Sequence, residues 1–143
     1  MQISFRKLEL IKQHAVQVFP EECCGLLAGK RETMLNGSLE NVIHEIAPCR
    51  NRAWWNRIGS FEIALSDYLD VEREAIQAGY TVIGTYHSHT DAGAFPSQQD
   101  YESAPANHTS LIVAVRSGIV ADARAWIHKE QSPFAEEKIH IRL

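Results

Sequence analysis

The chain has 143 residues and a formal net charge of −4, so it is the size of one domain and long enough to bury a hydrophobic core. Its composition, 45% hydrophobic and 22% charged residues, is that of an ordinary globular protein and disfavours disorder. The charge also disfavours nucleic acid as a partner, because Arg50, Arg52 and Arg57 form only a small basic cluster.

Membrane and disulfide chemistry are disfavoured as well. No segment resembles a cleavable leader or reaches the roughly 18 apolar residues of a membrane span, so we expect a cytoplasmic protein with no membrane partner. The cysteines Cys23, Cys24 and Cys49 are odd in number and two of them are adjacent, which argues against a disulfide framework.

The first part of the chain alternates helical and extended patterns. Residues 7–19 carry apolar side chains at helical spacing, which predicts a helix. The apolar run at 23–29 predicts a buried strand. Residues 32–48 predict a β-hairpin, because Asn36-Gly37 lies between two extended segments and is a strong turn signal.

A polar stretch with two adjacent tryptophans, Trp54 and Trp55, comes next. Adjacent side chains point to opposite faces of extended chain, so we expect one ring to be buried and the other exposed. Residues 62–78 then predict a second helix that ends at Gly79. Its apolar stripe comprises Leu65, Tyr68, Leu69, Ala75 and Ile76.

The last part of the chain is mostly extended. The patterns predict a strand at 80–89, a short helix at 97–106 and three closing strands at 110–115, 121–128 and 138–143. Several strands follow one another directly in this order. The sequence therefore predicts an α/β fold of the α+β type, a single domain in which helices pack on a mixed, partly antiparallel sheet.

The segment 84–100, GTYHSHTDAGAFPSQQD, has the residues of a metal site. In a strand, His87 and His89 point to the same face, and imidazole nitrogen is a preferred zinc ligand. Asp100 offers a carboxylate after a turn that contains Gly and Pro. Two histidines and one carboxylate leave a fourth tetrahedral position open, which is typical of a catalytic zinc.

The same segment also has a purely structural interpretation. Ser97 followed by Asp100 resembles a capping box at the start of a helix, and on its own SQQD favours a cap over a catalytic element. The combination of the two histidines with Ser97 and Asp100 makes chance a poor explanation. Cap and catalytic element can also coexist in the same two residues.

HSHTDAGAFPSQQD resembles the H-S-H-x7-S-x2-D signature of the JAMM, or MPN-plus, zinc metalloproteases. PEECCGLLAG is similar to the upstream element of that family, in which a Glu stands two residues before a Cys-Gly pair. The likeness covers nearly the whole chain, including Asn51 after the hairpin. One departure is Thr90, where many relatives have Pro, and this affects the expected shape of the loop at 90–96.

The resemblance implies a role for each matching residue. His87, His89 and Asp100 would bind Zn²⁺, Glu22 would act as general base and pass the proton to the leaving amine, and Ser97 would help to stabilise the oxyanion. It also implies that residues 1–143 form a single JAMM/MPN metalloprotease domain, with a mixed curved sheet flanked by helices that is similar to cytidine deaminases.

Other residues have weaker claims. Glu21 is expected to be solvated, since adjacent glutamates at a strand entrance point in different directions. Cys24 with a distant His could form a cysteine hydrolase dyad, but its apolar strand pattern favours a small buried side chain. A nucleobase deaminase would need H-x-E and P-C-x-x-C motifs, which this sequence lacks.

The substrate follows from the resemblance only by analogy. Compact members of the family resemble prokaryotic enzymes that process ubiquitin-like sulfur-carrier proteins near a C-terminal Gly-Gly, and such a tail could bind as an added strand. The expected activity is hydrolysis of an amide bond by a peptidase or isopeptidase. The alternative is a non-catalytic MPN-type interaction scaffold, which would normally have lost metal ligands. The oligomeric state stays open.

Overall fold

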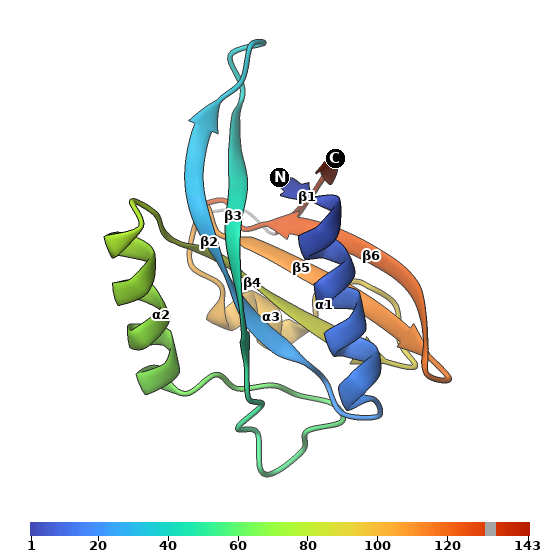
Figure 1. Ribbon diagram of the computed structural model, residues 1–143. Coiled ribbons are helices and arrows are strands. Elements are labelled where there is room, and N and C mark those ends of the chain that lie inside the picture. Colours follow the sequence, from blue (N-terminus) through green and yellow to red (C-terminus); the bar gives the residue numbers. More distant parts are fainter. Residues whose placement is uncertain (131–133) are drawn as a thin grey trace.

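The computed structural model describes residues 1–130 and 134–143, which form an eight-stranded mixed sheet with helices on both faces (Figure 1). The strand order is β7-β6-β5-β4-β2-β3-β1-β8. In chain order the elements are β1 (Gln2–Ser4), α1 (Phe5–Val18), β2 (Cys24–Thr33), β3 (Leu39–Cys49), α2 (Leu65–Gln77), β4 (Thr81–Thr90), α3 (Gln98–Ser103), β5 (Thr109–Arg116), β6 (Ile119–Ile127), β7 (Ala135–Glu137) and β8 (His140–Arg142). The predicted single-domain α+β fold is confirmed.

The central strands bring distant parts of the sequence together. β2 is antiparallel to both β3 and β4, while β4 runs parallel to β5. In this register Cys24 lies opposite His87, so Glu22, two positions before Cys24, lies near the end of β4 that carries the histidines.

The predicted hairpin is also confirmed: β2 and β3 are joined through Asn36-Gly37, and Gly37 has a φ of 86° that favours glycine. The two strands extend beyond the rest of the sheet (Figure 1).

One face of the sheet is covered by α1 and holds most of the core. Ser4 caps this helix by accepting a hydrogen bond from the Lys7 N–H at 3.2 Å. The buried face of α1 consists of Leu8, Ile11 and Ala15, as the helical spacing predicted. A leucine or isoleucine side chain stabilises the fold by about 1.5–3 kcal/mol when it is fully buried. On the sheet, this core includes Leu27, Ile43, Tyr86, Leu111 and Val113.

The prediction for α2 is partly wrong. The helix begins at Leu65 with Ala64 as its N-cap, three residues later than expected, and most of its apolar stripe is exposed. Only Ala75 is buried within it, whereas Leu65 is 72% exposed and Leu69 is 54% exposed. Periodicity identifies residues that share a face of a helix, but it does not reveal whether another element covers that face.

The loop between β3 and α2 differs from the expectation for its tryptophans. Both rings are largely in solvent, Trp54 at 81% and Trp55 at 49% exposure, so the prediction that one is buried is wrong. The alternation that the prediction assumed holds for an extended strand, and these residues form turns instead.

Two of the C-terminal elements, the short helix and the last strand, are shorter than predicted. Ser97 is the N-cap of α3 rather than its first residue, and the helix ends at Ser103, before Pro105. The single strand predicted at 138–143 is the short β8, and the sequence pattern missed β7. Among the described residues, no helix is long and apolar enough to cross a membrane.

We expect Gly25→Ala to destabilise the fold strongly. A Cβ at Gly25 would overlap the ring of Tyr86, which is fully buried and fixed by a 2.8 Å hydrogen bond between its hydroxyl and His14 Nδ1. Overpacking of this kind typically costs about 1–3 kcal/mol. Urea unfolding measures the loss, with Gly59→Ala as control, because the nearest atoms there belong to the exposed Asn56 side chain. Equal stability of the two variants would contradict this packing.

Candidate metal and catalytic site

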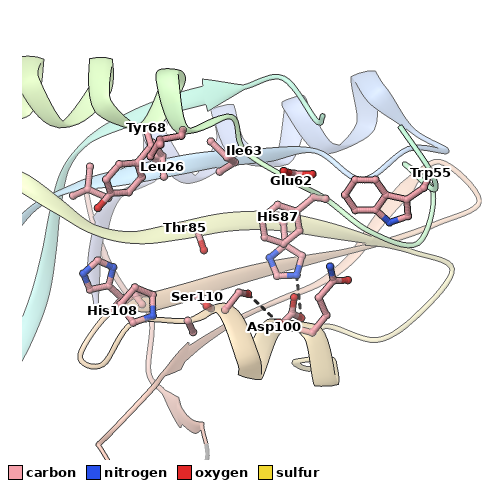
Figure 2. A pocket seen from close by; sticks show the side chains of 18 residues that line it. Leu26, Trp55, Glu62, Ile63, Tyr68, Thr85, His87, Asp100, His108 and Ser110 are labelled. Carbon is pink, nitrogen blue, oxygen red and sulfur yellow. Dashed lines mark hydrogen bonds and ion pairs between the residues drawn. The ribbon is translucent and has the colours of Figure 1, made fainter. Parts of the chain in front are cut away.

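Three of the predicted ligands meet on the face of the sheet opposite α1. His87 and His89 project from the end of β4, and Asp100 projects from the first turn of α3. The Nε2 atoms of His87 and His89 are 3.2 Å apart. Asp100 Oδ2 lies 3.3 Å from Nε2 of His87 and 3.6 Å from Nε2 of His89. Figure 2 shows His87 and Asp100 facing each other. The chain therefore gathers two imidazoles and one carboxylate from two elements.

The spacing of these three atoms fits one zinc ion. Ligands at about 2.0–2.1 Å from a tetrahedral zinc lie about 3.3–3.4 Å from one another. The observed 3.2, 3.3 and 3.6 Å agree with this value. A second possible set replaces Asp100 by Glu22, whose carboxylate lies within 4.8 Å of the histidine ligand atoms. The shorter distances favour Asp100 as the ligand and place Glu22 beside the site.

The ring orientation of His89 is fixed by the loop that follows β4. Its Nδ1 lies 2.8 Å from the carbonyl oxygen of Gly93, which can only accept a hydrogen bond. The proton therefore resides on Nδ1, and Nε2 keeps its lone pair for a metal. The ring of His87 stacks on Phe61 with a centroid distance of 4.4 Å. Both imidazoles are thus held by neighbours outside the metal cluster.

Burial and the hydrogen bonds within the cluster shift the pKa values of its members. Burial opposes ionisation of Asp100, but hydrogen bonds with His87 and His89 outweigh it and hold the pKa of this carboxyl well below its usual value. Burial lowers the pKa of His87, whereas the contact with Asp100 overcomes burial at His89 and raises its pKa. Burial raises the pKa of Glu22 to about 8. The cluster thus pairs an anionic carboxylate with imidazoles, as a cation site requires.

Ser97 and Asp100 form the capping box that the sequence suggested. Ser97 Oγ accepts from the Asp100 N–H at 3.2 Å, and Asp100 Oδ2 accepts from the Ser97 N–H at 2.8 Å. This Oδ2 is the same oxygen that lies between the two histidines. The cap and the metal-binding geometry therefore coexist, because the cap orients the carboxylate.

The two adjacent glutamates point to different surroundings. The side chain of Glu21 is 45% exposed and forms an ion pair with Arg57 at 3.2 Å. Glu22 is only 5% exposed and lies beside the histidines. This arrangement agrees with the expected solvation of Glu21. Cys24 is also fully buried, and burial raises the pKa of its thiol, which disfavours a nucleophilic role.

The segment that carries Glu22 is held by contacts between residues that lie far apart in the sequence. Asn51 Nδ2 donates to the carbonyl of Glu22 at 3.1 Å. Ser88 Oγ accepts from the Cys23 N–H at 2.8 Å, and Thr90 Oγ1 donates to the carbonyl of Pro20 at 2.7 Å. Thr90 is the departure from the family pattern, and a proline there could not make this bond. In the sequence, these contacts are indicated only by the position of the three polar residues close to the two motifs.

Two cavities beside the histidines and Asp100 share Phe61, Gln99 and Asp100 as walls. The larger, about 500 Å³, is mostly apolar and lies between α2, α3 and the floor of β4, with His87 at one end (Figure 2). The smaller, about 220 Å³, is lined by groups that include Glu22, His89 and Ser97. The smaller cavity therefore brings the proposed base and hydroxyl to one space, and the larger extends from it along the sheet.

This fold and cluster define a JAB-type domain, and the sequence agrees. Residues 6–129 match the family of prokaryotic homologs of the JAB domain, so the chain belongs to that family. A desampylase from Pyrococcus furiosus is 30% identical over 120 residues, which are 84% of this chain and 76% of that protein.

Solved structures share the fold. A protein from Desulfitobacterium hafniense is 22% identical with a TM-score of 0.81, and the match covers 99% of this chain and 92% of that one. A structure described as a JAMM metalloprotease-like zinc site in the proteasome and signalosome is 19% identical with a TM-score of 0.57, covering 100% of this chain and 98% of that one. At these identities the likeness shows the fold alone.

Proposed function

We propose that this chain is a zinc-dependent metallopeptidase or isopeptidase, and that residues 1–143 act as one such domain. The observation that carries the proposal is the spacing of three ligand atoms, from His87, His89 and Asp100, at 3.2 to 3.6 Å from one another. The JAB family membership and the desampylase relative support hydrolysis of an amide bond.

The residues divide the chemistry among them. When bound, zinc supplies Lewis acidity toward the attacking water and the scissile carbonyl. Glu22 accepts the proton of the attacking water and returns it to the leaving amine, a role that suits a buried carboxylate beside the ligands. Ser97 keeps its own hydroxyl hydrogen, because its oxygen only accepts in the capping box, so it can donate to the developing oxyanion.

The proposed substrate is a ubiquitin-like protein that ends in Gly-Gly, or its conjugate. The support is the desampylase relative, which is 30% identical over 84% of this chain. A glycine pair has no side chains, so its backbone can approach closely in a narrow space such as the smaller cavity of about 220 Å³.

Cleavage mapping tests the substrate. Purified zinc-loaded protein is incubated with ubiquitin-like carriers that are extended beyond Gly-Gly or joined to a lysine through an isopeptide bond. Mass spectrometry should place the cut directly after the second Gly, and chelation should abolish it. Hydrolysis of unrelated short peptides with all carriers intact would refute the carrier substrate, and no hydrolysis at all would refute the peptidase.

Ser97→Ala is expected to show both roles of this residue. Loss of the N-cap should lower the free energy of unfolding by about 1 kcal/mol, and loss of the oxyanion donor should lower kcat by roughly 10²–10³ with zinc content unchanged. Ser4→Ala is the matched control, because it removes the N-cap of α1 far from the cluster. A Ser97→Ala protein that loses only stability, as Ser4→Ala should, would leave the hydroxyl with a structural role alone.

A further inference from the structure

The loop between β3 and α2 combines positive charge with aromatic side chains. Residues 46–61 contain three arginines and no acidic residue, in a chain whose net charge is −4. Within this stretch we call residues 50–60 the Arg-Trp loop, since they carry Arg50, Arg52, Trp54, Trp55 and Arg57. Arg and Trp are the residue types most enriched at the energetic centres of protein interfaces.

Three apolar side chains of the Arg-Trp loop are exposed to solvent. Trp54 is 81% exposed, Trp55 is 49% exposed and Ile58 is 55% exposed. The two indoles touch edge to face, with centroids 5.9 Å apart. In the described part of the chain, Arg52 has no ion-pair partner, whereas Arg57 pairs with Glu21. A cluster of exposed rings beside a free cation is typical of an interaction site.

The loop is nevertheless held firmly in place. The side chain of Asn51 accepts hydrogen bonds from the N–H groups of Ala53 and Glu62, at 2.9 and 3.2 Å, and donates to the carbonyl of Ser60 at 2.9 Å. These bonds tie the two ends of the loop together. The exposed rings therefore sit on a fixed backbone, so binding them does not require a loop to become ordered.

The Arg-Trp loop is continuous with the proposed active site. Trp55 lines the larger cavity and Ile58 lines the smaller one. The Glu22 N–H donates to the carbonyl of Arg57 at 2.8 Å, so the loop backbone also contacts the segment that carries the proposed base. A protein bound on this loop would hold its chain terminus at the entrance to both cavities.

We propose that the Arg-Trp loop docks the folded body of the protein substrate, through a surface on that substrate where carboxylates surround exposed apolar side chains. This inference rests on the proposed function and adds the chemistry of the partner's surface. The arginines select the negative charge, and Trp54 supplies the apolar anchor. A folded substrate would then be held at two places, its tail in the cavities and its body on the loop.

The test compares a folded substrate with its isolated tail. The probe is an acidic ubiquitin-like sulfur-carrier protein, extended beyond its C-terminal Gly-Gly, and the reference is a short peptide with the same tail. Trp54→Ala and Arg52→Glu change exposed side chains that line neither cavity. The control variants Leu35→Ala, at the tip of the β2–β3 hairpin, and Arg6→Glu, on α1, make the same kinds of change elsewhere.

We expect each loop variant to raise KM for the carrier about tenfold or more and to leave kcat/KM for the peptide at the wild-type value. The two control variants should match the wild type on both substrates. High salt should weaken carrier binding by the wild type, and Arg52→Glu should remove much of that dependence. Replacing surface carboxylates of the carrier with amides should reproduce the loss. Equal KM values for wild type and loop variants would overturn the docking site and leave the peptidase proposal intact.

A binding measurement tests the docking surface independently of the proposed peptidase activity. Titration of the full chain with the unextended carrier, followed by tryptophan fluorescence, needs no catalysis. Binding that Trp54→Ala weakens would support the docking surface even if no substrate were cut. Self-association of the chain, or binding of single-stranded DNA, that depends on Trp54 while the carrier does not bind would overturn it.

Discussion

Glu22→Gln is expected to lower kcat by about 10²–10⁴, the range typical of a lost general base, with zinc content unchanged. The amide keeps the shape of the buried side chain but cannot accept the proton of the attacking water. Glu22 is 5% exposed and lies within 4.8 Å of the histidine ligand atoms, so no solvent carboxylate could replace it readily. Steady-state kinetics together with metal analysis of the purified variant provide the measurement.

Glu21→Gln is the matched control, because it makes the same chemical change one residue earlier. Glu21 forms a half-exposed ion pair with Arg57, and such pairs contribute at most about 1 kcal/mol. Its kinetics should therefore stay close to those of the wild type. A Glu22→Gln protein with full activity, or an inactive Glu21→Gln protein, would contradict the assigned base.

Asp100→Asn is expected to weaken zinc binding by more than the 10–100-fold typical of losing an outer-shell partner, and to lower activity accordingly. The amide oxygen can still accept the hydrogen bond from the Ser97 N–H, so the cap of α3 is preserved while the anionic ligand is lost. Competition with a chromogenic chelator measures the affinity.

The control for this variant is Asp91→Asn in the loop after β4. Asp91 Oδ1 accepts from the Ser117 N–H at 2.9 Å, and an amide oxygen can do the same. Zinc affinity should be unchanged there. Undiminished zinc binding by Asp100→Asn would remove Asp100 from the ligand set and favour the alternative set that contains Glu22.

The sequence indicated the main elements of the fold because their signals are local. The spacing of Leu8, Ile11 and Ala15 predicted α1, and Asn36-Gly37 predicted the hairpin. The predictions that are wrong concern whether another element covers a given apolar side chain. In α2, Leu65 and Tyr68 line a cavity while Leu69 and Ile76 are exposed, and no pattern within the helix distinguishes these surroundings from a core.

The sequence predicted the residues of the candidate site but not the hydrogen bonds that hold the surrounding backbone in place. Strand alternation placed His87 and His89 on one face, and the capping-box pattern placed Ser97 beside Asp100. The contacts from Asn51, Ser88 and Thr90 to the segment around Glu22 join residues far apart in the chain. Such contacts depend on the sheet register, which residue patterns along one chain do not specify.

Titration of the metal-free full chain with zinc tests the central claim most directly. Calorimetry should show one tight site per chain, since His87, His89 and Asp100 place three ligand atoms at 3.2 to 3.6 Å from one another. Replacing both histidines by alanine should abolish that site. Absence of zinc binding by the wild type, or binding that persists in the double variant, would contradict the metal centre on which the proposed hydrolysis depends.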